Sequence, residues 1–226
     1  MKLAAAIRRL TPVTGIPRAI LVTDPVRLPD PRPVLPFLPP GAVVLLRLYD
    51  GDDRRDLAEK VAVACRRHRL RLVVAADWRL AAAIRADGVH LPEWMARRGV
   101  LAAVRGWVRR RGGLLIAACH SPMALARARC RGVDAAILSP VFPTHSHPAA
   151  AGIGAVRWRG WARRAGLPVI ALGGITGSSA LRLGPVGVAG YGAISGWITD
   201  GACAPPSPDS CRSAGGSGFP ASGSAE

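Results

Sequence analysis

Eight short apolar segments constrain the fold of this chain more than any other feature of its sequence. Each is apolar almost throughout, which is typical of strands that are buried on both faces of a parallel sheet. Because helical patterns separate them, the sequence predicts a (β/α)8 TIM barrel, with an open doubly wound sheet as the alternative. The segments are 19–24, 42–50, 70–76, 88–92, 113–121, 133–142, 167–175 and 186–194.

The helical segments between these strands are of uneven quality. Residues 53–69 form a clear amphipathic pattern, with Leu57 and Val61 on one face. Residues 26–41 stand where the first helix is expected, but their prolines lack the backbone N–H and clash with the preceding turn. We therefore expect a barrel with a degenerate first helix.

Composition divides the chain into three parts. Residues 1–18 are an N-terminal extension, residues 19–200 form the barrel domain, and residues 201–226 form a tail rich in Pro, Gly and Ser. The tail has almost nothing apolar to bury, so we expect it to be disordered. It stands where an eighth helix would close the barrel.

The formal net charge of +17 is carried by arginine, because Lys2 and Lys60 are the only lysines among 31 basic residues. The arginines recur on most predicted helices and form no single stripe. This distribution is typical of a solvated surface and not of a specific nucleic-acid interface.

The cysteines and the hydropathy pattern favour a cytoplasmic protein. No pair of cysteines has CxxC spacing, which argues against a zinc site or a disulfide framework and fits a reduced compartment. No apolar stretch approaches the ~20 residues of a membrane span, and the apolar run near the N-terminus is too short for a secretory signal. The cysteines are Cys65, Cys119, Cys130, Cys203 and Cys211.

Glycines at the ends of two neighbouring strands predict a phosphate site. In a TIM barrel the ligand lies at the carboxyl ends of the strands, and phosphate often binds after strands seven and eight. Gly173 and Gly174 end the seventh predicted strand, and Gly190, Tyr191 and Gly192 belong to the end of the eighth. Glycine lets the backbone approach an anion closely, and free N–H groups bind it. Tight turns alone are the alternative explanation.

The loop after the sixth strand contains two of the five histidines of the chain. His145 and His147 alternate there with the hydroxyl residues Thr144 and Ser146, and an Ala/Gly-rich stretch typical of a flap follows. The histidines can donate hydrogen bonds to an anion. Without a nearby carboxylate, the pair is weak evidence for a metal site.

Two further histidines lie at or near strand ends. His120 ends the fifth predicted strand, where it fits either a general acid or base or a structural residue. His90 lies within the short fourth strand, and we expect it to be a core residue of the barrel.

In this order, the landmarks resemble those of the thiamine phosphate synthase/TenI family, whose fold is a TIM barrel. In that family the synthases join thiazole phosphate to a pyrimidine methyl pyrophosphate, and pyrophosphate leaves with the help of Mg2+. TenI-type relatives instead tautomerise a thiazole phosphate carboxylate without needing that metal. The matching stretches lie within residues 19–196 and include "DGVHL", "SPVFPT" and "ALGGI".

The resemblance implies roles for several residues of this chain. Arg47 corresponds to the arginine that binds pyrophosphate, and Gly174 and residues 190–192 correspond to the thiazole phosphate site. His120 matches the histidine that TenI-type enzymes use for proton transfer. In the flap, Thr144 is kept.

Other positions depart from the family pattern. Ser146 and His147 replace a threonine and a lysine of the flap, and Tyr49 replaces a second lysine, near the pyrophosphate-binding arginine. These changes remove positive charge from the expected pyrophosphate site, because an unperturbed histidine is mostly neutral at pH 7.

The metal-binding aspartates of the family are also replaced. Ala75 and Ala76 stand where the family has an Asn-Asp pair, and Met95 stands at the second aspartate. Asp77 and Glu93 lie next to these positions, and they are the residues that would hold Mg2+ if the chain were a synthase.

The resemblance therefore implies a protein of thiamine biosynthesis that binds thiazole phosphate, with TenI-like tautomerisation as the leading chemistry and no required cofactor. Two alternatives are a divergent, Mg2+-dependent synthase and a non-catalytic barrel that binds a phosphorylated ligand. The expected partner is a small phosphorylated substrate, with neither a membrane nor a specific nucleic acid, and a homo-oligomer is compatible with the sequence.

Overall fold

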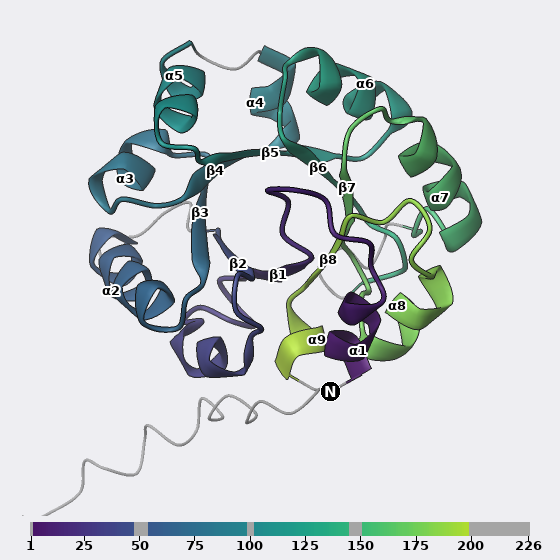
Figure 1. Ribbon diagram of the computed structural model, residues 1–226, viewed down its shortest axis with the longest axis horizontal. Coiled ribbons are helices and arrows are strands. Elements are labelled where there is room, and N and C mark those ends of the chain that lie inside the picture. The colour runs from purple at the N-terminus through teal and green to yellow at the C-terminus, as the bar shows by residue number, and fades with distance from the viewer. Residues whose placement is uncertain (1, 48–53, 99–101, 145–150, 199–226) are drawn as a thin grey trace, which may run out of the picture.

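The computed structural model describes residues 2–47, 54–98, 102–144 and 151–198. Eight parallel strands pair in chain order, and the last pairs with the first, so the sheet is closed (Figure 1). This closure confirms the predicted TIM barrel and rules out the open sheet. The strands are β1 (Ala19–Val22), β2 (Val43–Leu46), β3 (Arg71–Ala75), β4 (Gly88–Leu91), β5 (Leu114–Cys119), β6 (Ala135–Leu138), β7 (Val169–Ala171) and β8 (Gly190–Ala193).

Strand side chains divide between the barrel interior and an outer layer. Aliphatic residues such as Ile20, Val73 and Ile116 fill the interior, while their sequence neighbours point outward and pack against the helices. Because successive residues of a strand face opposite sides, both sets must be apolar. This requirement explains why the strands read as continuous apolar runs.

Helices surround the barrel (Figure 1). The degenerate first helix is the 3-10 helix η1, which contains Pro36. After the barrel closes, α9 follows β8 and ends at the last described residue. The helices are α1 (Lys2–Arg8), η1 (Arg32–Phe37), α2 (Arg54–Arg67), α3 (Trp78–Ala83), α4 (Glu93–Arg98), α5 (Ala102–Arg110), α6 (Pro122–Cys130), α7 (Ala155–Arg164), α8 (Gly177–Leu183) and α9 (Ser195–Ile198).

The N-terminal extension is part of the packed molecule. Helix α1 lies against α8 and buries Leu3 and Ile7 in the outer layer, where Leu10, just after the helix, is buried with them. The chain then crosses the amino end of the barrel (Figure 1), where Ile16 packs against the interior residues. This segment therefore covers the end of the barrel that lies opposite the expected site. The predicted tail, residues 201–226, lies outside the described residues.

The last strand is shorter than predicted. A strand was expected over residues 186–194, but Pro185 to Val188 form a turn, closed by a 3.2 Å hydrogen bond from the Val188 N–H to the Pro185 carbonyl. Gly187 has a positive φ of 77° within this turn. The strand consequently begins at Gly190.

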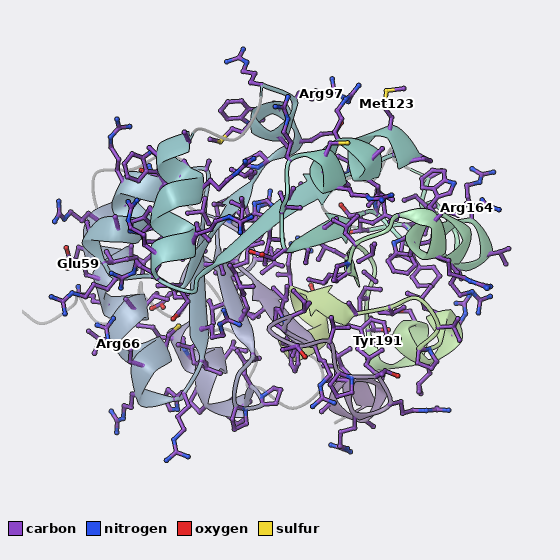
Figure 2. The ribbon with its side chains drawn as sticks, turned by 45° about the horizontal axis from the view of Figure 1, so that its top comes forward. Glu59, Arg66, Arg97, Met123, Arg164 and Tyr191 are labelled. Carbon is purple, nitrogen blue, oxygen red and sulfur yellow. The ribbon has the colours of Figure 1, made fainter. Side chains whose placement is uncertain are left out.

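The basic surface is spread around the molecule. Arg66 on α2 and Arg164 on α7 extend outward on different sides of the barrel (Figure 2). Some arginines pair locally, as Arg55 does with Glu59 at 2.9 Å. No helix within the described ranges is long and apolar enough to span a bilayer.

The packing of α1 gives a stability prediction. Ile7→Ala should lower the free energy of unfolding by about 2–5 kcal/mol, because it opens a cavity in a packed layer. Arg8→Ala, on the exposed face of the same helix, should change it by less than about 0.5 kcal/mol. Urea denaturation measures both, and equal stability of the two variants would contradict the docking of α1.

Candidate functional site

The carboxyl ends of the strands bring most of the predicted site residues to one end of the barrel, which we call the mouth. Arg47 directly follows β2, and its N–H donates to the hydroxyl of Thr23 at 2.8 Å, which ties the ends of β1 and β2 together. The other residues of the mouth that concern the site are Asp24, Ala76, Asp77, Glu93, His120, Ser139, Gly173, Gly174, Ile194 and Ser195.

His120 is held in place by the neighbouring strand. Its Nδ1 lies 2.8 Å from the carbonyl oxygen of Ser139, the residue after β6. Because a carbonyl only accepts hydrogen bonds, Nδ1 carries the hydrogen and Nε2 of the neutral ring keeps a free lone pair. Nε2 lies 3.9 Å from Oε2 of Glu93, and the His120 side chain is 52% exposed. A ligand in the mouth can therefore reach a ring whose orientation is fixed.

The neighbours of His120 are not available as nucleophiles. Burial, together with the charge of Glu93, raises the pKa of the Cys119 thiol to about 12, so the reactive thiolate does not form near neutral pH. The Ser121 hydroxyl caps α6 by accepting a hydrogen bond from the Ala124 N–H at 3.2 Å. His120 is thus the group at this strand end that can exchange a proton with a ligand.

The two carboxylates expected to replace the metal ligands are paired with arginines. Oδ2 of Asp77 accepts from the Arg54 guanidinium at 3.0 Å, and Oδ1 accepts from the N–H of Leu80 as the N-cap of α3. Oε1 of Glu93 accepts from the Arg97 guanidinium at 2.7 Å. Both side chains therefore already have cationic partners.

A third carboxylate of the mouth behaves in the same way. Although burial alone would raise the pKa of Asp24, hydrogen bonds from the side chain and N–H of Arg27 and from the N–H of Val26 lower it to about 2. Across the described ranges, no group of three His, Cys, Asp or Glu side chains is placed to hold a metal ion. Both oxygens of Asp77 and Oε1 of Glu93 already accept hydrogen bonds within the protein, which leaves only Oε2 of Glu93. Because Mg2+ is held by several oxygen ligands, the residues present do not fit a magnesium site built on Asp77 and Glu93.

The backbone at Ala76 has a conformation that suits another residue. Its φ is 63°, in the left-handed region, which alanine rarely adopts and Asn and Asp tolerate better. The resemblance aligns this position with a metal-binding aspartate of the family. The main chain at Ala76 therefore has a conformation that suits an aspartate, although the side chain here is a methyl group.

Gly173 and Gly174 lie at the mouth, and their conformations require glycine. Their φ values are 94° and 62°, and an added Cβ would lie 2.7 Å from Cα of Pro140 or from the carbonyl oxygen of Pro143. No described residue accepts a hydrogen bond from the N–H of either glycine. These two amides can therefore donate to an anion.

The helix that follows these glycines contributes less than expected. Thr176 and Ser179 form a capping box that closes the N-terminus of α8. Its N–H groups are therefore partly satisfied within the protein, and the glycine amides are the better donors.

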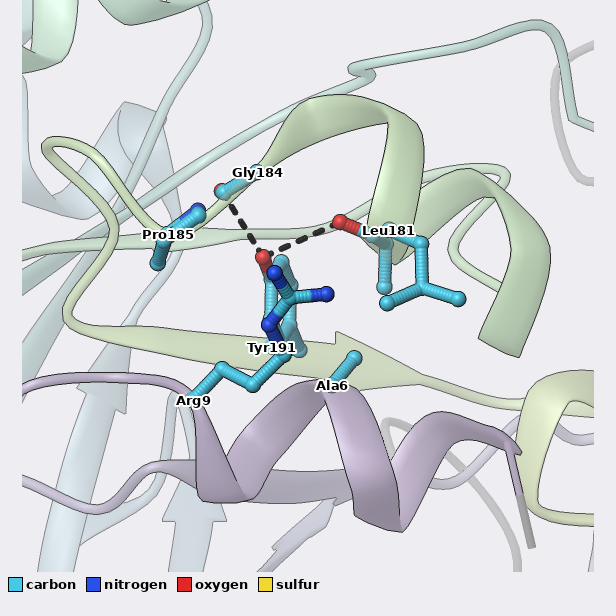
Figure 3. Close-up of a pocket in the computed structure, with 7 residues that line it drawn as sticks. Ala6, Arg9, Leu181, Gly184, Pro185 and Tyr191 are labelled. Atoms are coloured by element: carbon cyan, nitrogen blue, oxygen red, sulfur yellow. Dashed lines mark hydrogen bonds between the residues drawn. The ribbon is translucent and has the colours of Figure 1, made fainter.

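The structure corrects the expected positions of Gly190 and Tyr191. Both lie at the amino end of β8, and the Tyr191 N–H already donates to the carbonyl of Arg18 at 2.9 Å. The Tyr191 hydroxyl points into the outer layer, where it donates to the carbonyls of Ala180 at 3.2 Å and Gly184 at 2.9 Å (Figure 3). Their expected placement at the carboxyl end is wrong, because the strand begins four residues later than predicted.

The structure describes only some of the remaining predicted residues. Gly192 pairs with Ile20 and faces the barrel interior, and Thr144 is half-buried after β6. Ser146 and His147 lie outside the described residues, as does His145. A role of these residues in binding stays a prediction.

The turn after β8 is a part of the mouth that sequence reasoning missed. A Cβ on Gly196 would lie 2.5 Å from the carbonyl oxygen of Ile175, so the turns after β7 and β8 touch. Ile194 joins β8 to α9, whose first residue is Ser195. The sequence signal for this part of the mouth is a serine and a glycine directly after an apolar strand. The site residues predicted for this strand, 190–192, lay before that signal.

Two hollows described by the structure lie away from the mouth. One, of about 30 Å³, lies between α1 and α8 beside Tyr191 and Arg9 (Figure 3) and has room for about one water molecule. The other, of about 470 Å³, lies on the outside between α6 and α7, beside Cys130 and Trp161. Neither is lined by His120 or Gly174, so the geometry of the strand ends locates the candidate site.

The position of Tyr191 gives a second prediction. Tyr191→Phe should cost about 1 kcal/mol, because two hydrogen bonds to backbone carbonyls are lost, and should lower the melting temperature by roughly 2–4 °C. Ligand binding at the mouth should not change. Calorimetry and ligand titration test both parts, and weaker binding with an unaltered melting temperature would return Tyr191 to the site.

Comparison with known proteins places the chain in a family. The family model described as thiamine monophosphate synthase matches residues 34–197. Thiamine-phosphate synthases of Thiobacillus denitrificans and Bacillus velezensis are 34% and 29% identical, over 63% and 64% of this chain and 67% and 63% of theirs. The structure of a thiamine phosphate pyrophosphorylase from Pyrococcus furiosus shares the fold, with a TM-score of 0.62 and 21% identity over 79% of this chain and 85% of that one. The chain belongs to the thiamine phosphate synthase/TenI family.

Proposed function

We propose that this protein binds thiazole phosphate at the barrel mouth and that His120 transfers a proton in a metal-independent tautomerisation of the TenI type. The observation that carries the proposal is the fixed orientation of His120 between the Ser139 carbonyl and Glu93. Membership of the family supports this substrate class, and the surviving residues of the mouth support this chemistry.

The hydrogen bonds of His120 suit a proton carrier. With Nδ1–H donating to Ser139, the lone pair of Nε2 can take a proton from the substrate. The resulting imidazolium is stabilised by Glu93, whose Oε2 lies 3.9 Å away. Return of the proton to a different substrate atom completes a tautomerisation and regenerates the neutral ring, so no further reactant is needed.

The end of β7, which β6 separates from the end of β5, supports binding of the phosphate. The N–H groups of Gly173 and Gly174 have no acceptor among the described residues, and the turn at Ser195 lies close to them because the two turns touch. Amides that converge on one point are the usual protein ligands of a phosphate dianion. Binding at this edge leaves the ring of the substrate near the barrel axis.

A divergent synthase is the second candidate, and the relatives named thiamine-phosphate synthase favour it. That reaction must stabilise a departing pyrophosphate, for which metal ions and cations are each worth several kcal/mol. The arginine partners of Asp77 and Glu93 argue against this route. A barrel that binds thiazole phosphate without turnover is the third candidate, because it requires only the glycine amides.

His120→Ala is the test of the proposed chemistry. It should lower kcat for thiazole phosphate carboxylate tautomerisation by about 10²- to 10⁴-fold, because the proton carrier is lost, and should change the Kd for the substrate by less than about threefold. The wild-type rate should be unaffected by EDTA. His68→Ala, in the turn directly after α2, is the matched control and should retain full activity.

Two outcomes would decide against tautomerisation. Mg2+-dependent release of pyrophosphate from the two synthase substrates, with rescue of a thiamine auxotroph, would establish the synthase. Binding of thiazole phosphate with neither reaction detected would establish the non-catalytic barrel.

A further inference from the structure

The hollow between α6 and α7 lies on the outer surface of the barrel, away from the mouth, and has a volume of about 470 Å³. This volume is within the range of small-molecule sites, which are concave and mostly apolar with a few polar groups. The two helices are neighbours in the outer ring (Figure 1). The residues of its lining that concern the ligand are Leu125, Ala126, Arg129, Cys130, Trp161 and Arg164.

The apolar part of the lining includes an aromatic ring. Leu125 is buried, and the half-buried Trp161 packs against the same outer layer. The indole N–H of Trp161 has no acceptor among the described residues. By contrast, the buried indoles of Trp158 and Trp197 each donate to a backbone carbonyl at 3.0 Å. The hollow therefore offers an apolar surface for a flat ligand, together with an unused donor.

The charged groups of the hollow are all cationic. Arg129 on α6 and Arg164 on α7 are exposed, and Arg164 extends outward (Figure 2). Neither side chain pairs with a carboxylate of the described residues, whereas Arg55 and Arg97 each pair with a glutamate one turn away. None of the residues that line the hollow is acidic. The apolar surface thus lies beside positive charge that these residues do not neutralise.

The guanidinium of Arg129 reaches from α6 to the end of α7. A Cβ added to Gly166 would lie 2.8 Å from Nη1 and 3.1 Å from Nε of Arg129. The guanidinium therefore lies against the main chain at Gly166, in space that a side chain there would fill. A group that is already held against the protein loses less conformational freedom when it binds a ligand, so Arg129 is well placed to pair with an anion.

The combination of a ring surface and free cations selects the kind of occupant. A second copy of this chain does not fit, because each copy has a net charge of +17 and the two arginine-rich faces would repel. An extended polyanion would meet the scattered arginines but would leave the apolar surface unused. A small aromatic anion satisfies both, because its ring packs on Trp161 while its charge pairs with Arg129.

We propose that the hollow between α6 and α7 is a binding site for a small aromatic anion, whose ring packs on Trp161 and Leu125 and whose charged group accepts hydrogen bonds from Arg129. Arg164 adds positive charge at the rim. The site does not depend on the proposed function, because none of the mouth residues named above lines the hollow.

Fluorescence titration of the full chain with two matched probes tests the ligand class. The probes are 8-anilinonaphthalene-1-sulfonate and N-phenyl-1-naphthylamine, which has the same rings without the sulfonate. The sulfonate probe should bind saturably, and the neutral probe should bind about tenfold more weakly or less, because its hydrogen bonds to a charged group are missing. Equal affinity for the two probes, or no saturable binding of the sulfonate, would overturn the proposal.

Two pairs of exposed variants locate the site. Ala126→Glu places a carboxylate in the hollow, at a helical position that glutamate suits, and should weaken binding of the sulfonate by about tenfold or more. Ala103→Glu on α5 changes the net charge equally and should leave the affinity within about twofold.

The second pair removes one arginine each. Arg129→Ala should weaken binding of the sulfonate by about three- to tenfold, because a charge-assisted hydrogen bond at the surface is lost. Arg131→Ala, outside the lining, should leave the affinity within about twofold. Equal affinities within either pair would show that the probe binds elsewhere or responds only to net charge, and would overturn the proposal.

Cys130 provides a measurement that needs no substitution. Its thiol is exposed and lines the hollow, so bound sulfonate probe should slow its alkylation by iodoacetamide. At a probe concentration of ten times Kd the rate should fall by about tenfold, in proportion to the unoccupied fraction. Mass spectrometry of the peptide that contains Cys130 measures this rate. An unchanged rate at that concentration would contradict the proposed location.

Discussion

Pairing of β1 with β8 is the interaction on which the rest of the structure depends, because it turns a sheet with two edges into a barrel with one mouth. The register aligns Ala19 with Tyr191 and Leu21 with Ala193. Trp197 reinforces the seam, because its ring N–H donates to the carbonyl of Ile20 at 3.0 Å. Closure fixes the positions of all eight strand ends, and the placement of the site residues at the ends of β2, β4, β5 and β7 follows from it.

The sequence predicted the architecture well because burial on both faces leaves a one-dimensional signal. Residues 72–76 are apolar at every position, because a strand buried on both faces needs apolar side chains whatever its partners are. Boundaries at glycine-rich ends were harder to predict, because the apolar residues Val186 and Val188 suit a turn as well as a strand. The error of four residues at the start of β8 placed Gly190 and Tyr191 at the mouth, whereas they lie at the opposite end of the strand.

Of the two ion pairs at the mouth, only that of Glu93 with Arg97, four residues apart on one helix, has a spacing that the sequence shows; that of Asp77 with Arg54 depends on the fold. Asp77 and Glu93 are next to the replaced metal positions, but their partners are determined by helices that bring Arg54 and Arg97 within 3.0 and 2.7 Å. An arginine-rich composition makes such pairing common. On the outer surface the excess of arginine has little effect. At the mouth, guanidinium groups pair with the carboxylates that a cation would need. The lack of a hydrogen-bond partner for Nδ1 of His90 could not be predicted either, because it depends on the strands that flank β4.

The torsion angle of Ala76 has a consequence for how this protein can change. A peptide unit already in the left-handed region imposes no rebuilding on an incoming asparagine or aspartate. An asparagine or aspartate at position 76 would therefore project from an unchanged main chain, while Met95, the other position that the resemblance aligns with a metal-binding aspartate, would need its own substitution. A carboxylate at this corner is thus separated from the present sequence by a change of side chain and not by a rearrangement of the backbone.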